Sequence, residues 1–79
     1  MRFRVPDTSP PYLCIEILSP DDPAVEVRAK IEGYLAMGVA YVWIVDPLKR
    51  RGEIHTREGI ERVNDGRFRA GSLEADLAY

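Results

Sequence analysis

Two apolar runs, at residues 12–18 and 39–45, flank a segment with helical periodicity, and this order constrains the fold more than any other feature of the chain. Only Glu16 interrupts the apolar side chains of the first run, a pattern typical of a strand covered on both faces. A strand, a helix and a second strand with short connections form a right-handed crossover. We therefore predict two parallel strands, at about residues 12–18 and 40–46.

The helix between these strands is expected at about residues 23–37. Pro23 favours the first helical position, and Asp22 before it suits the N-cap. Gly38 suits the left-handed conformation that ends many helices. Positions three and four residues apart form an apolar face that would pack on the sheet. This face comprises Ala24, Val27, Ile31, Tyr34 and Leu35.

The C-terminal third of the sequence predicts short antiparallel strands. Residues 51–56 and 60–64 alternate between polar and apolar side chains. The Asp65-Gly66 pair is a hairpin signal and predicts that a strand at 67–69 pairs with 60–64. The pattern at 72–79 is too weak to assign. The fold class is thus a small α/β domain with one crossover followed by antiparallel hairpins.

A chain of 79 residues and 9.0 kDa is expected to form one domain over residues 1–79. A domain of this size buries only about 60% of its unfolded surface, so its core is thin. The single cysteine, Cys14, cannot form an internal disulfide, and a lone His55 offers no zinc cluster. We therefore expect a homo-oligomer, in which a second subunit adds the missing support.

Charge and hydropathy limit the partners. The longest apolar run, 39–45, has seven residues, which is too short for a membrane span, and the N-terminus has no signal-peptide pattern. We expect a cytoplasmic protein without a membrane partner. The net charge is −2, but residues 49–69 hold seven basic and four acidic side chains. That segment is either a solvated charged hairpin, the more ordinary interpretation, or a surface for an anionic partner.

Glu16 demands a chemical explanation, because a carboxylate within an apolar strand must be paired, protonated or bound to a metal. One structural explanation is a partner such as Arg4 on a neighbouring strand. Lys30 lies at the rim of the apolar helical face, so we predict that its long side chain points toward Glu16 rather than only toward Glu26. The ordinary alternative is an ion pair with Glu26, worth about 0.2–0.5 kcal/mol at this spacing. Asp7, after a proline, is ordinarily a turn residue.

Two other reactive residue types have ordinary explanations. Cys14 lies within a predicted strand and is expected to be a small core residue. His55 alternates with Glu53 on a strand that we expect to be exposed, and one histidine forms neither a metal site nor a triad.

Two segments of the sequence have an order of residues that is specific enough to compare with a known family. The segments 11–22 (PYLCIEILSPDD) and 34–47 (YLAMGVAYVWIVDP), with Lys30 between them, resemble the Uma-type restriction endonucleases of the PD-(D/E)XK nuclease superfamily. Residues 2–7 resemble the strand that carries the Pro-Asp of that family. The resemblance implies a restriction-endonuclease-like core, a divalent metal, usually Mg²⁺, and DNA as substrate.

The same resemblance assigns roles to three residues. Asp7 matches the Pro-Asp carboxylate and Glu16 the second carboxylate, so both would be catalytic and would ligate the metal. Leu18 stands where the superfamily usually has its lysine, and Lys30 matches the catalytic lysine that this family carries on the following helix. Two carboxylates and a lysine suit phosphodiester hydrolysis, since oxygen ligands hold a hard cation and the lysine offsets developing charge.

The chain also departs from the family pattern. Family members are about twice as long, and the helix and strand that precede their Pro-Asp strand are missing from this sequence. If residues 3–7 and 12–16 form a hairpin, four residues separate Asp7 from the level of Glu16, or roughly 13 Å. The alternative to a Mg²⁺-dependent endonuclease is therefore an inactive remnant that acts as a small oligomeric or nucleic-acid-binding module.

Overall fold

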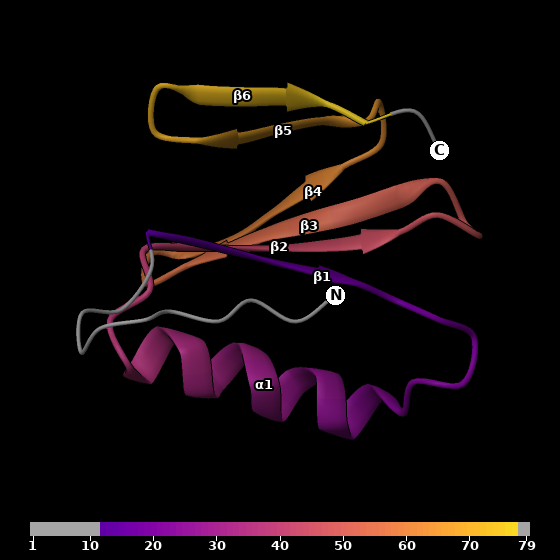
Figure 1. Ribbon diagram of the computed structural model, residues 1–79, viewed down its shortest axis with the longest axis horizontal. Helices are drawn as coiled ribbons and strands as arrows, with labels where there is room; N and C mark the ends of the chain where they lie inside the picture. Colours follow the sequence, from indigo (N-terminus) through magenta and orange to yellow (C-terminus); the bar gives the residue numbers. More distant parts are fainter. Residues whose placement is uncertain (1–11, 78–79) are drawn as a thin grey trace.

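The computed structural model describes residues 12–77, which form three layers (Figure 1). A four-stranded sheet lies between one helix and a two-stranded sheet. The elements in chain order are β1 (Leu13–Ile17), α1 (Ala24–Ala36), β2 (Tyr41–Asp46), β3 (Arg51–Thr56), β4 (Gly59–Val63), β5 (Arg67–Ala70) and β6 (Leu73–Asp76).

The larger sheet has the strand order β1-β2-β3-β4. β1 runs parallel to β2, from the pair Leu13 and Tyr41 to the pair Ile17 and Val45. β3 and β4 then add as antiparallel strands. The predicted crossover and its parallel strands are confirmed, and so is the α/β fold class.

Helix α1 ends as predicted but begins differently. Gly38 has φ 99° and closes the helix, with the Gly38 and Val39 amides donating to the carbonyls of Leu35 and Tyr34. The expected Asp22 N-cap is wrong, because Pro23 occupies the N-cap with extended backbone and no side chain caps the helix. Asp22 instead accepts a hydrogen bond of 2.9 Å from the Ser19 amide in the preceding turn.

The face of the sheet toward α1 carries the smaller apolar cluster. Its buried members are Cys14, Ile31, Val39, Val42 and Ile44. Three residues of the predicted helical face, Val27, Tyr34 and Leu35, pack against this cluster. Ala24 is exposed, so its assignment to that face is wrong.

The opposite face is covered by β5 and β6. Its buried cluster comprises Trp43, Val45, Ile54, Val63, Phe68 and Ala70. The rings of Trp43 and Phe68 lie 5.3 Å apart, and the Trp43 indole donates to the Arg69 carbonyl at 2.9 Å. A Cβ at Gly52 would collide with Phe68 and with the Ile44 carbonyl, so this close approach requires glycine.

The predicted pairing of 60–64 with 67–69 is wrong. β4 belongs to the four-stranded sheet, whereas β5 pairs with β6 in a separate sheet. The Asp65-Gly66 turn therefore carries the chain from one layer to the next, because Phe68 and Ala70 bury their side chains against the larger sheet. β6 itself lies within residues 72–79, where no strand was assigned from the sequence. No helix within residues 12–77 is long and apolar enough to cross a membrane.

Candidate functional site

Glu16 lies near the carboxyl end of β1, opposite Ile44 of β2, and faces α1. Its side chain is 12% exposed. A carboxylate at this depth requires polar partners. Those partners come from the helix that the crossover places over the strand.

Two α1 residues reach the two oxygens of this carboxylate. The Tyr34 hydroxyl donates to Glu16 Oε1 at 2.9 Å, and Lys30 Nζ lies 4.0 Å from Glu16 Oε2. Lys30 and Tyr34 are four residues apart and thus neighbours on the helix surface. The helix therefore presents a hydrogen-bond donor and a cation to one carboxylate.

The predicted orientation of Lys30 toward Glu16 is confirmed. Within residues 12–77, Lys30 forms its ion pair with Glu16, and none joins it to Glu26. The Lys30 side chain is 53% exposed. Solvent screens such a contact, so the ion pair contributes little to stability and the ammonium remains accessible from outside. Asp7, Arg4 and the proposed hairpin of residues 3–7 with 12–16 lie outside the described residues.

Tyr34 was missed as a polar partner by the sequence analysis. Its position on the apolar face of the helix correctly predicted that its ring packs on the sheet. The signal that could have identified the contact is its spacing of four residues from Lys30, combined with the known tendency of a buried hydroxyl to find a partner.

Cys14, two residues before Glu16, behaves as the predicted core residue. It is buried and 3% exposed. Burial, and after it the charge of Glu16, raises the pKa of the Cys14 thiol. A thiol that resists ionisation is a poor nucleophile.

His55 is not on an exposed strand, which corrects the expectation. β3 lies between β2 and β4, and His55 is buried opposite Val42. Its Nε2 lies 2.8 Å from Glu53 Oε1. The neighbouring carboxylate is thus a hydrogen-bond partner for Nε2 of the buried imidazole.

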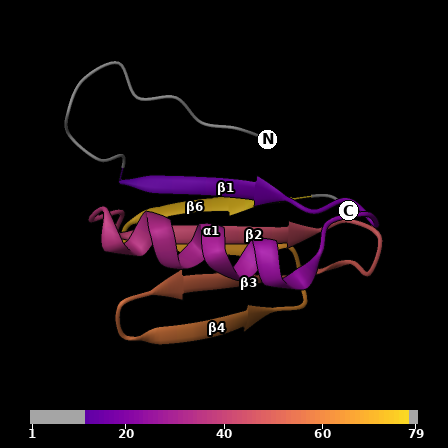
Figure 2. The same ribbon diagram turned by 90° about the horizontal axis from the view of Figure 1, so that it is seen from below.

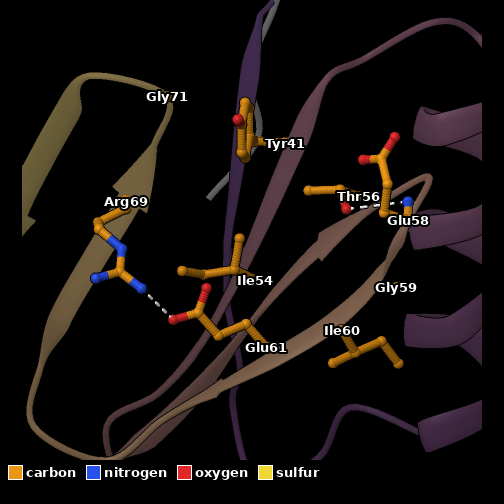
Figure 3. Close-up of a pocket in the computed structure, with 9 residues that line it drawn as sticks. All are labelled: Tyr41, Ile54, Thr56, Glu58, Gly59, Ile60, Glu61, Arg69 and Gly71. Carbon is orange, nitrogen blue, oxygen red and sulfur yellow. Dashed lines mark hydrogen bonds and ion pairs between the residues drawn. The ribbon is translucent and has the colours of Figure 1, made fainter.

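A separate open cavity of about 350 Å³ lies on the other face of the sheet, beside β5 (Figure 3). Its lining includes Arg69 and Glu61, which point toward each other and form an ion pair. The cation in this cavity is therefore neutralised. Since Glu16 faces α1, the cavity and the Glu16 cluster are on opposite sides of the sheet.

The fit of a metal ion depends on the donors available. Within residues 12–77, no group of three or more His, Cys, Asp or Glu side chains is arranged to hold a metal ion. The Glu16 carboxylate is nevertheless a hard oxygen donor of the type that Mg²⁺ prefers. Its donor chemistry fits this ion, and Asp7, the second carboxylate implied by the family resemblance, lies outside the described residues.

Comparison with known proteins agrees with the fold. The Uma2 family, described as "Putative restriction endonuclease", matches residues 2–76. The chain is also similar to the crystal structure of a putative nuclease belonging to DUF820 from Anabaena variabilis ATCC 29413, with 25% identity and a TM-score of 0.69. That match covers 81% of this chain but only 40% of the solved one. No match was found among curated proteins. The predicted family is confirmed, and the chain belongs to the Uma2 family.

Proposed function

We propose that the protein is a Mg²⁺-dependent endonuclease that hydrolyses phosphodiester bonds of DNA. The observation that carries the proposal is the largely buried Glu16 carboxylate, with the Tyr34 hydroxyl at one oxygen and the Lys30 ammonium near the other. Membership of a family described as putative restriction endonucleases supports a role for these three side chains in phosphodiester hydrolysis. A single domain and a cytoplasmic location accompany the proposal.

In this proposal Glu16 and Asp7 hold the metal. When bound, Mg²⁺ supplies Lewis acidity toward the phosphate. Tyr34 fixes the rotamer of the Glu16 carboxylate, so that its remaining lone pairs keep one direction. Lys30, with its ammonium accessible, orients water and offsets the negative charge that develops on the phosphate.

The substitution Glu16→Gln tests the metal ligand. The amide keeps the shape of the side chain but loses the charge that holds a cation, so we expect Mg²⁺-dependent DNA cleavage to be abolished while the fold is kept. Mn²⁺ affinity, measured by calorimetry, should fall with it. The matched control is Glu32→Gln, which removes an exposed carboxylate on α1 and should change neither cleavage nor Mn²⁺ affinity.

Lys30→Met separates binding from catalysis. The thioether chain keeps the packing of the lysine stem, so Mn²⁺ should still bind while the cleavage rate falls. Cleavage by the unmodified protein that persists in EDTA, or that survives Glu16→Gln, would refute the proposed site. A folded protein that binds no metal and cleaves no DNA would instead favour the inactive remnant.

A further inference from the structure

β4 is an edge strand of the four-stranded sheet. Figure 2 shows no element of the described chain beyond it. The outward N–H and C=O groups of an edge strand are ready to pair with another strand. Exposed strand edges carry an aggregation hazard unless their side chains restrict which partner can add.

The edge and the turn before it carry one apolar and two charged side chains that are exposed. Ile60, in β4, is 62% exposed. Acidic Glu58 lies two residues before it, in the turn that leads into β4. Basic Arg62 lies two residues after it, within β4 and opposite Glu53 of β3, and both Glu58 and Arg62 are exposed. Within residues 12–77, neither side chain has an ion pair. The edge thus carries an apolar centre flanked by two exposed charges of opposite sign.

We infer that β4 pairs with β4 of a second copy of this chain, antiparallel about a two-fold axis at Ile60. In this register Ile60 meets the partner subunit's Ile60. Glu58 then meets the partner subunit's Arg62, and the same contact is repeated on the other side of the axis. Opposite charges in directly opposed positions stabilise a strand pair, whereas like charges destabilise it.

Charge selects this register over its neighbours. An axis at Glu61 places two glutamates opposite each other, and an axis at Arg62 places two arginines opposite each other. With the axis at Ile60, Glu61 meets the partner subunit's Gly59 and keeps its own ion pair with Arg69. Figure 3 shows Ile60 pointing away from Glu61 and Arg69, so the apolar contact and that ion pair do not compete.

The pairing would also add buried apolar surface to a domain whose own core is thin. It joins two four-stranded sheets into one and removes the exposed Ile60 side chains from water. The inference does not depend on the proposed nuclease activity, because no residue of the Glu16 cluster takes part in it.

Disulfide trapping tests the register directly. Directly opposed residues of antiparallel strands have Cα atoms about 4.5–5.5 Å apart, which a disulfide can bridge. Ile60→Cys should therefore cross-link under mild oxidation into a dimer, roughly tenfold or more faster than Val25→Cys. Val25 is 75% exposed on α1 and serves as the matched control, and the native Cys14 is buried.

Charge reversal provides a second measurement on the full chain, by sedimentation over a concentration series. Glu58→Arg creates two like-charge pairs per dimer and should weaken association roughly tenfold. Combining it with Arg62→Glu restores opposite signs and should restore association. Circular dichroism checks that each variant is folded. We expect each to fold, because the substituted residues are exposed.

Each result decides the inference. Fast cross-linking at position 60 together with rescue by the double charge reversal supports it. A folded protein that stays monomeric at every concentration overturns it. So does cross-linking of Ile60→Cys no faster than that of Val25→Cys, or a double reversal that associates as weakly as Glu58→Arg alone.

Discussion

The two faces of the four-stranded sheet are covered by different elements and use different chemistry. Toward β5 and β6, Trp43 and Phe68 are almost fully buried and the one indole N–H is satisfied by a backbone carbonyl. Toward α1, a smaller apolar cluster adjoins the Glu16 carboxylate and its helical partners, and His55 is buried on the same face. One face supplies apolar burial, and the other combines a core with ionisable groups.

The difference has an energetic basis. Burial of large aromatic side chains is the main source of stability in a chain this short. A largely buried carboxylate costs desolvation that its partners only offset, so the α1 face gives up part of its stabilising capacity to hold Glu16. Substitutions on the two faces should therefore separate stability from function.

The strongest test of this separation is Phe68→Ala. Phe68 is fully buried and packs on Trp43 and Gly52, so its loss leaves a cavity between the two sheets. We expect the free energy of unfolding in urea to fall by about 3–5 kcal/mol, a large share of the roughly 5–15 kcal/mol typical of whole domains.

Leu73→Ala is the control for this prediction, since Leu73 is half exposed on β6 of the same sheet. Its effect should stay within about 1 kcal/mol. If Phe68→Ala were as mild as Leu73→Ala, the face covered by β5 and β6 would not be the main stabilising core.

The sequence predicted the crossover because its signals are local. Helical periodicity, Pro23 and Gly38 fixed the helix to within a residue at each end, and the two apolar runs fixed the parallel strands. It failed at the layer change after β4, because alternation of buried Phe68 with exposed Arg69 identifies a strand but not its partner. β6 has only four residues, so its alternation of Leu73 and Ala75 with two acidic residues was too short to be assigned from the sequence.

The candidate site was predicted only in part for a related reason. A carboxylate within an apolar strand can be recognised from the sequence, because its burial costs desolvation free energy that few other positions carry. Lys30 was expected near Glu16 from its place at the rim of the helical face, and its contact agrees. The hydroxyl of Tyr34 was missed because its ring follows the apolar period of the helix, and only its spacing of four residues from Lys30 indicated a polar contact. The catalytic roles of Asp7, Glu16 and Lys30 stay predictions.

Tyr34→Phe sharpens the comparison by removing one polar atom from the α1 face while keeping the ring. The variant loses the hydrogen bond to Glu16 Oε1, so we expect the free energy of unfolding to fall by about 1 kcal/mol. Under the proposed function, Mn²⁺ affinity should fall as well, because the carboxylate loses its fixed orientation. Calorimetry measures the second effect separately from the first.

Tyr41→Phe is the matched control, because Tyr41 contacts Tyr12 rather than Glu16. It should leave Mn²⁺ affinity unchanged. A Tyr34→Phe variant with unaltered metal affinity would show that the hydroxyl serves stability alone.

The smallest expected effect concerns the tyrosine pair away from the Glu16 cluster. The rings of Tyr12 and Tyr41 lie 5.3 Å apart, and desolvation, followed by the charge and the hydrogen bond of Tyr41, raises the pKa of Tyr12 above 10.0. A folded-state pKa above the unfolded value means that the folded protein holds this proton more tightly. The resulting stabilisation is fully present below pH 10.0 and is lost as the pH rises through the folded-state pKa.

NMR titration of ring-labelled tyrosine should show Tyr12 ionising at a higher pH than an ordinary tyrosine. The substitution Tyr41→Phe should lower the pKa of Tyr12 part of the way, because the effect of desolvation remains. If Tyr12 in that variant titrated as in the unmodified protein, Tyr41 would have no part in the shift.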